Sequence, residues 1–189
     1  MTPTPLFRGA LNVPNLLTLL RILLVPLFVN LILYGYPGYA LIVFLAAGVT
    51  DALDGLIARL ANQRTTLGQY LDPLADKLLL VTAFVVLSVR GVIPVWATII
   101  VVSRDAILIL GALIVHLLRE QVDVMPTWIG KVTTVSQLGY ILGVLGGMVM
   151  PQTATLLHPL LFIMLLFAFV SGFHYLFRGI RMMSGEGVS

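Results

Sequence analysis

The chain contains no cysteine, and only 10% of its 189 residues are charged. The absence of cysteine excludes disulfides and redox chemistry through thiols. The charged fraction is roughly 25% in an ordinary soluble domain. Here 59% of the residues are hydrophobic, more than one soluble core of this size could hide. The net charge of +3 is too small and too scattered for a nucleic-acid partner. We therefore expect an integral membrane protein that contacts the lipid bilayer and its headgroups.

Six apolar segments are long enough to cross a bilayer, because a helix needs about 20 residues to span about 30 Å of hydrocarbon. Backbone polar groups find no water inside lipid, so these segments are predicted to be helices and the fold to be all-α. The segments cover residues 16–34, 39–60, 71–89, 92–118, 132–150 and 155–177. We predict one membrane-embedded domain over residues 1–189.

The basic residues of the loops are distributed unequally between the two sides of the predicted bundle. If the N-terminus is cytoplasmic, the opposite side receives only Arg90. The cytoplasmic side receives Arg8, Arg59, Arg64, Arg119, Lys131, Arg178 and Arg181. Positive residues accumulate on the cytoplasmic side of membrane proteins. Both termini are therefore predicted to be cytoplasmic, in a membrane of the bacterial inner or plasma type.

Four aspartates lie close together in the stretch "DALDGLIARLANQRTTLGQYLDPLADKL", residues 51–78. Asp51 and Asp54 share one face of the second predicted helix, because residues three or four apart are neighbours on a helix surface. Asp72 and Asp76 share one face of the third, provided that this helix extends back to Gly68. The short connection makes the two helices antiparallel neighbours, so the four carboxylates are expected to converge near the cytoplasmic surface.

Four carboxylates in one place would repel each other strongly at low dielectric. Multivalent cations relieve this repulsion, and ligation by carboxylate oxygens suits Mg²⁺, Mn²⁺ or Ca²⁺. Two divalent ions are the usual device for displacement at phosphorus. The structural alternative is neutralisation by Arg59, Arg64 and Lys77. Ionisable residues within membrane helices are more often functional, which favours the metal interpretation.

The pattern Asp51-x-x-Asp54-Gly55-x-x-Ala58-Arg59, followed by eight residues and then by Gly68-x-x-x-Asp72-x-x-x-Asp76, resembles the complete signature of the CDP-alcohol phosphatidyltransferase family. The resemblance extends from "NVPNLLTLLRILLVP" near the start to "TWIGKVTT" in the fifth segment. It implies a six-helix fold, usually a homodimer, with a polar cavity open to the cytoplasm. It also implies a reaction in which an acceptor hydroxyl attacks CDP-diacylglycerol and CMP leaves.

The resemblance assigns roles to individual residues of the signature. Two divalent cations, Mg²⁺ or Mn²⁺, would be held by Asp51, Asp54, Asp72 and Asp76. Asp76 would also act as the catalytic base for the acceptor hydroxyl. The pocket for CDP would be formed by Asn15, Thr18, Gly55, Ala58, Arg59 and Gly68.

Two glycerol-containing acceptors fit the pattern "LDPLADKLL": phosphatidylglycerol, as in cardiolipin synthases, and glycerol 3-phosphate. Arg104 lies within an apolar run, and together with Lys131 it could bind an acceptor phosphate. The glycerol 3-phosphate enzymes typically carry Arg-Glu here and a second Arg eight residues later, whereas this chain has Arg104-Asp105 and Ala112. One cation is thus missing for a doubly charged phosphate, which favours phosphatidylglycerol. A structural pair of Arg104 with Asp105, or with a carboxylate on another helix, is the alternative.

Three further features carry open alternatives. Arg21 could simply reach out to the headgroups from the first helix. Gly139, Gly143 and Gly147 could pack helices within one subunit, the favoured interpretation, or across a dimer. The whole chain could be a cation transporter, but its acidic residues do not form a path across the membrane and have no counterpart in the second half.

Overall fold

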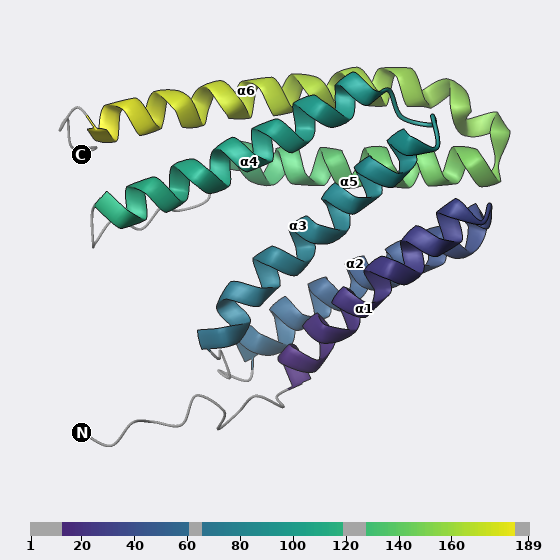
Figure 1. Ribbon diagram of the computed structural model, residues 1–189, viewed down its shortest axis with the longest axis horizontal. Coiled ribbons are helices and arrows are strands. Elements are labelled where there is room, and N and C mark those ends of the chain that lie inside the picture. Colours follow the sequence, from purple (N-terminus) through teal and green to yellow (C-terminus); the bar gives the residue numbers. More distant parts are fainter. Residues whose placement is uncertain (1–12, 61–65, 119–127, 184–189) are drawn as a thin grey trace. The chain divides into compact units, whose positions relative to one another are not determined.

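The computed structural model describes the backbone of residues 13–60, 66–118 and 128–183, and side chains within 19–50, 77–111 and 128–177. The described residues form long α-helices and one short 3₁₀ helix, without any strand in these ranges (Figure 1). The elements are α1 (Val13–Leu33), α2 (Pro37–Leu60), α3 (Thr66–Val89), α4 (Val95–Leu118), α5 (Trp128–Val149), η1 (Pro151–Leu156) and α6 (Leu157–Met183). The all-α prediction is confirmed, and each predicted segment lies mostly within one of these helices.

Glycines terminate helices at two of the predicted breaks. Gly35 has a φ of 80° and Gly91 a φ of 70°, a region that residues with a Cβ rarely adopt. At the end of α1, the N–H of Gly35 donates to the carbonyl of Ile32, and the N–H of Tyr36 donates to that of Leu31. This pair of bonds is the Schellman motif, which satisfies the last carbonyls of a helix. The chain can therefore turn within a few residues and start α2 antiparallel to α1.

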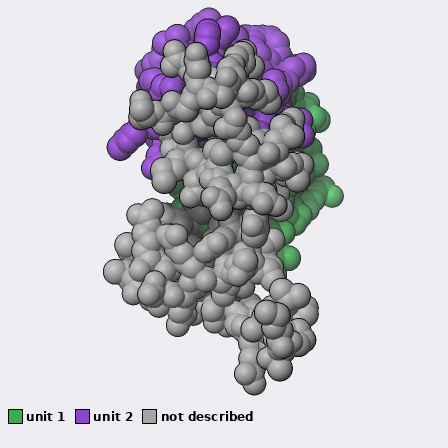
Figure 2. All heavy atoms as spheres, turned by 90° about the vertical axis from the view of Figure 1, so that its left-hand side faces the viewer, with its two compact units in different colours: residues 1–90 green, residues 91–189 purple. Residues whose placement is uncertain are grey.

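The chain divides into two compact units, residues Met1–Arg90 and Gly91–Ser189 (Figure 2). In the first unit, α1 packs against both α2 and α3. The contact surfaces are stripes at helical spacing, and the rings of Phe28 on α1 and Phe44 on α2 meet with centroids 5.7 Å apart. The buried stripe residues are Val25, Phe28 and Ile32 on α1, Ala40, Phe44 and Ala47 on α2, and Leu80, Ala83 and Leu87 on α3.

In the second unit, α6 packs against α5 and α4, and η1 closes the turn between α5 and α6. Position 143 of α5 approaches α6 closely, since a Cβ built on Gly143 would lie 3.1 Å from Leu160 Cδ1. A Cβ built on Gly147 would lie 3.3 Å from Leu157 Cδ1, whereas one on Gly139 would meet nothing within 4 Å. Packing within one chain is therefore confirmed for Gly143 and Gly147.

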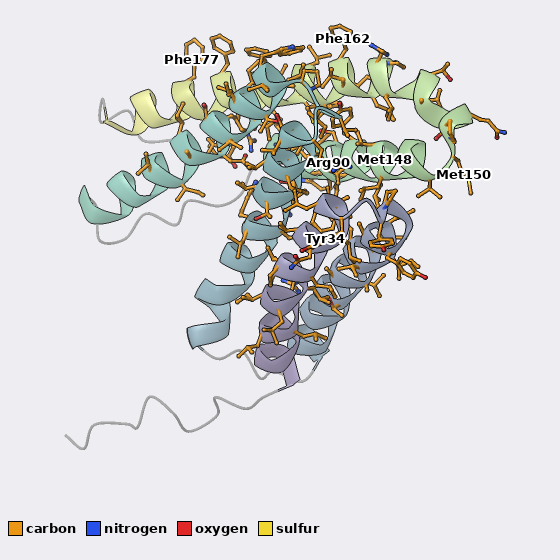
Figure 3. All side chains as sticks on the ribbon, turned by 45° about the vertical axis from the view of Figure 1, so that its right-hand side comes forward. Tyr34, Arg90, Met148, Met150, Phe162 and Phe177 are labelled. Carbon is orange, nitrogen blue, oxygen red and sulfur yellow. The ribbon has the colours of Figure 1, made fainter. Side chains whose placement is uncertain are left out.

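Large apolar side chains face outward on every helix whose side chains are described. On α6, Phe162, Phe169 and Phe177 are all more than half exposed, and Phe162 and Phe177 point away from α5 in Figure 3. Two stretches with described side chains are long and apolar enough to cross a bilayer, Trp128–Val149 and Pro151–Tyr175. A helix that is apolar on its outer surface belongs in lipid. Membrane integration is supported, and six crossings remain a prediction.

Candidate functional site

The signature aspartates occupy positions that continue the buried stripes of α2 and α3. On α2 the stripe runs through Ala40, Phe44 and Ala47, and the same spacing of three and four residues leads on to 51, 54 and 58. On α3 the stripe of Leu80, Ala83 and Leu87 leads back to 76 and 72. By spacing, the faces that are apolar at one end of each helix carry the acidic residues at the other end.

Helix α3 extends back far enough to include Gly68, as the predicted alignment of the acids requires. It begins at Thr66, so Gly68, Asp72 and Asp76 all lie in one helix. The side chains of all four signature aspartates lie outside the described residues, and so do the side chains of the other predicted donor-site residues, Asn15, Thr18, Ala58 and Arg59. The backbone of Gly55 and Gly68 is helical. Among the described side chains, His, Cys, Asp and Glu form no group of three that could hold a metal. The metal and CDP assignments therefore remain predictions.

Arg21 does not reach out to the headgroups, so that interpretation was wrong. Its side chain is 1% exposed and lies on the same stripe of α1 as Val25 and Phe28. The spacing 21, 25, 28, 32 could have revealed this, because a residue in step with the core face of a helix points inward.

Arg104 on α4 is the centre of a buried polar cluster in the second unit. Its Nη1 donates to Asp105 Oδ1 at 2.6 Å, and its Nη2 donates to the hydroxyl oxygen of Ser171 on α6. Arg104, Asp105 and Ser171 are all buried. The pair of Arg104 with Asp105, considered above as the structural alternative, is thus present. The Nε of Arg104 is also buried, and no hydrogen-bond partner is described for it. Ser171 was missed in the sequence because its partner lies 67 residues away on another helix.

Lys131, the second predicted acceptor residue, is exposed near the start of α5, with its Nζ 5.7 Å from the centre of the Trp128 ring. The register of α5 against α6 places it at the level of Arg104. The hydroxyl of Thr133 donates to the carbonyl of Phe167, and Ser171 follows one turn later on α6, toward the start of α5. Both cations therefore lie in the same layer of the second unit, although no direct hydrogen bond joins these two described side chains.

Comparison with known proteins gives the site its context. The sequence matches the family model described as CDP-alcohol phosphatidyltransferase over residues 11–173. The chain belongs to this family. The matched residues include the whole aspartate signature as well as Arg104, Asp105, Lys131 and Ser171, so the family resemblance covers both compact units.

Similar proteins from three organisms carry names within this family. A "Cardiolipin synthase (CMP-forming)" of Streptomyces coelicolor is 39% identical over 66% of this chain and 60% of its own length. A "Probable phosphatidylglycerophosphate synthase" of Mycobacterium tuberculosis is 33% identical over 92% of this chain and 84% of its own. The human "Cardiolipin synthase (CMP-forming)" is 39% identical over 72% of this chain and 50% of its own.

These matches establish the enzyme class. The chain is a phosphatidyltransferase of phospholipid synthesis, and the alternative of a cation transporter is not supported. The two kinds of relatives differ in their named product, so the family match alone leaves the acceptor open.

Proposed function

We propose that the enzyme transfers the phosphatidyl group of CDP-diacylglycerol to a hydroxyl of phosphatidylglycerol and releases CMP, as a cardiolipin synthase does. Glycerol 3-phosphate is the second candidate acceptor. The reaction class rests on the family match and on the complete aspartate signature. The signature lies at the ends of the buried stripes of α2 and α3, and α1 packs against both helices. The choice of acceptor rests on the pair of Arg104 with Asp105.

The donor set of the signature fits divalent cations. Asp51, Asp54, Asp72 and Asp76 supply oxygen ligands only, and they occupy one face of α2 and one face of α3 by spacing. Such ligands suit Mg²⁺ or Mn²⁺ and not zinc, which favours nitrogen and sulfur. Two such ions, when bound, neutralise charge on the diphosphate and on the departing CMP. These four residues would hold the ions in our proposal.

Asp76 is proposed to act as the general base. Its carboxylate takes the proton from the acceptor hydroxyl, the hydroxyl oxygen bonds to the phosphorus next to the diacylglycerol, and the bond from that phosphorus to CMP breaks. Correct orientation of the two reactants contributes much of the rate enhancement in such transfers. The pocket that orients the donor would be lined by Asn15, Thr18, Gly55, Ala58, Arg59 and Gly68.

The acceptor phosphate is proposed to bind at the Nε edge of Arg104, beside Lys131. Two donors of the guanidinium are already engaged by Asp105 and Ser171, and the Asp105 carboxylate offsets its charge. Lys131 is then the one cation of this layer without an acidic partner among the described residues. One net positive charge matches the single negative charge of a phosphodiester better than the double charge of glycerol 3-phosphate. This electrostatic balance supports phosphatidylglycerol as the acceptor.

Two further assignments complete the proposal. The distribution of basic residues supports an active site and both termini on the cytoplasmic side of a bacterial-type inner or plasma membrane. A homodimer is implied by the family resemblance, and Gly139 leaves open space on α5 where a second chain could approach.

Offering each acceptor separately to the enzyme tests the proposal. The purified protein is incubated in detergent with CDP-diacylglycerol, Mg²⁺ and either phosphatidylglycerol or glycerol 3-phosphate, and the lipid products are identified by mass spectrometry. We expect cardiolipin as the main product. Phosphatidylglycerophosphate as the main product would replace the acceptor and keep the reaction class. Failure to release CMP with any acceptor would refute the proposed reaction for this chain.

A further inference from the structure

Arg21 is the most deeply buried charged residue among the described side chains, with 1% of its surface exposed. Charged residues within membrane helices are costly and usually face a partner or a functional cavity. Arg21 lies on α1, the one helix of the first unit that packs against both signature helices (Figure 1). The position of Arg21 relative to the aspartates therefore depends on how α1 is aligned with α2 and with α3.

The register of α1 against α2 can be read from one aromatic contact. Phe28 meets Phe44 with ring centroids 5.7 Å apart. Seven residues make nearly two helical turns, so a step of seven along each helix returns to the same face. In this antiparallel pair, seven residues toward the start of α1 leads to Arg21, and seven toward the end of α2 leads to Asp51. Asp51 therefore occupies the register position across from Arg21.

The register of α1 against α3 follows from a contact at the opposite end of the unit. Arg90, which follows α3, donates from Nη1 to the carbonyl of Leu33 at 3.2 Å, and Figure 3 labels Arg90 and the neighbouring Tyr34. The two helices run in the same direction (Figure 1). Twelve residues before Leu33 is Arg21, and fourteen before Arg90 is Asp76, so both residues lie on the N-terminal side of this contact by similar numbers of turns. Asp76 thus lies toward the same end of the unit as Arg21.

Helical side chains lean toward the N-terminus of their helix, and the start of α1 lies at the end of the unit that carries the acids. The long side chain of Arg21 therefore extends along the helix toward the end of the unit that carries Asp51 and Asp76. These are the inner members of the two aspartate pairs. Asp54 lies closer to the end of α2, and Asp72 closer to the start of α3.

We propose that Arg21 is a permanent positive charge beside the aspartate cluster and a binding residue for the diphosphate of the donor. This inference rests on the proposed function. Four carboxylates and two divalent cations have no net charge together, so Arg21 adds one positive charge to the loaded site, beside that of Arg59 in the proposed CDP pocket. That charge attracts the doubly negative diphosphate, and it opposes the binding of cations when the nucleotide is absent.

Loss of the Arg21 charge should strengthen the binding of cations and weaken the binding of the nucleotide, so the test measures both affinities. Full-length wild type, Arg21→Met and Arg21→Lys are purified in detergent. Binding of Mn²⁺ without nucleotide is measured from the EPR signal of the free ion, and binding of CDP at saturating Mn²⁺ by equilibrium dialysis. Removal of a charge several ångströms from both ligands should change each affinity by about tenfold. In Arg21→Met we expect Mn²⁺ to bind more tightly and CDP more weakly, whereas Arg21→Lys should stay within about threefold of wild type for both.

The matched control is Arg90→Met, the same substitution at the opposite end of the same three helices, which should leave both affinities unchanged. Loss of both affinities together in Arg21→Met would show a purely structural role and overturn the inference, as would unchanged binding of both ligands. Weak CDP binding in Arg21→Lys would also overturn it, because the charge would then not be what matters. If Arg21→Met does not fold, Arg21→Gln provides the neutral variant with hydrogen-bonding capacity. A wild-type protein that binds neither Mn²⁺ nor CDP would instead refute the proposed function.

Discussion

Replacement of Asp105 by asparagine should change the preference of the enzyme between its two candidate acceptors. The substitution keeps the size of the side chain and removes the negative charge that lies 2.6 Å from Arg104 Nη1. Arg104 is 9% exposed, so solvent screens this charge poorly. In the variant, the layer of Arg104 and Lys131 gains one net positive charge. Glycerol 3-phosphate, with its doubly charged phosphate, should benefit more than phosphatidylglycerol.

The geometry of the cluster sets the size of the effect. A phosphate at the Nε edge of Arg104 would have its charge about 7 Å from the carboxylate of Asp105, given ordinary hydrogen-bond lengths. One unit of charge at that distance corresponds to about 1.2–2.4 kcal/mol for an effective dielectric constant of 20 to 40. The ratio of kcat/KM for glycerol 3-phosphate to that for phosphatidylglycerol should therefore rise about 8- to 60-fold.

The assay compares this ratio in wild type, Asp105→Asn and Ser171→Ala. Ser171→Ala removes the other described partner of Arg104 without changing any charge, so it should leave the ratio within about twofold of wild type. Thermal unfolding shows whether each variant is folded, because removing one partner of a buried ion pair is destabilising. An unchanged ratio in folded Asp105→Asn, or a shift toward phosphatidylglycerol, would refute the idea that Asp105 sets the charge felt by the acceptor.

Three more predictions follow from the fold and the signature. Asp76→Asn should lower the rate of CMP release about 10²- to 10⁴-fold with unchanged thermal unfolding, since it removes a general base; full activity with Mg²⁺ would exclude Asp76 from this role. Removal of divalent ions with EDTA should abolish transfer, and Mg²⁺ or Mn²⁺ should restore it; activity that survives EDTA would contradict the proposed ligands. Gly143→Val should lower the free energy of unfolding by about 1–3 kcal/mol because its Cβ would already lie 3.1 Å from Leu160. Gly139→Val should leave that free energy nearly unchanged, and equal losses in both variants would contradict the packing described here.

The sequence predicted the helices well because apolar length is a direct consequence of the membrane environment. The breaks at Gly35 and Gly91 were visible as gaps between the apolar segments. Both glycines have a left-handed backbone, which residues with a Cβ rarely adopt. Partners distant in sequence were not visible. Ser171 belongs to the Arg104 cluster only because α6 packs against α4, and that contact cannot be derived from the spacing of either helix. The burial of Arg21 was open to prediction from its spacing, but the cost of burying an arginine favoured the wrong interpretation.

The two clusters neutralise their charges in different ways, and this difference suggests how they operate. Arg104 is balanced within the chain by Asp105 and held by Ser171, so its geometry is fixed before any acceptor arrives. Such preorganisation reduces what binding must cost in lost side-chain freedom. In the proposed function, the four signature acids carry more charge than Arg21 and Arg59 together, so the proposed cations complete their neutralisation. In the proposed function, the acceptor site is therefore formed before its substrate arrives, whereas the donor site becomes competent when its ions are bound.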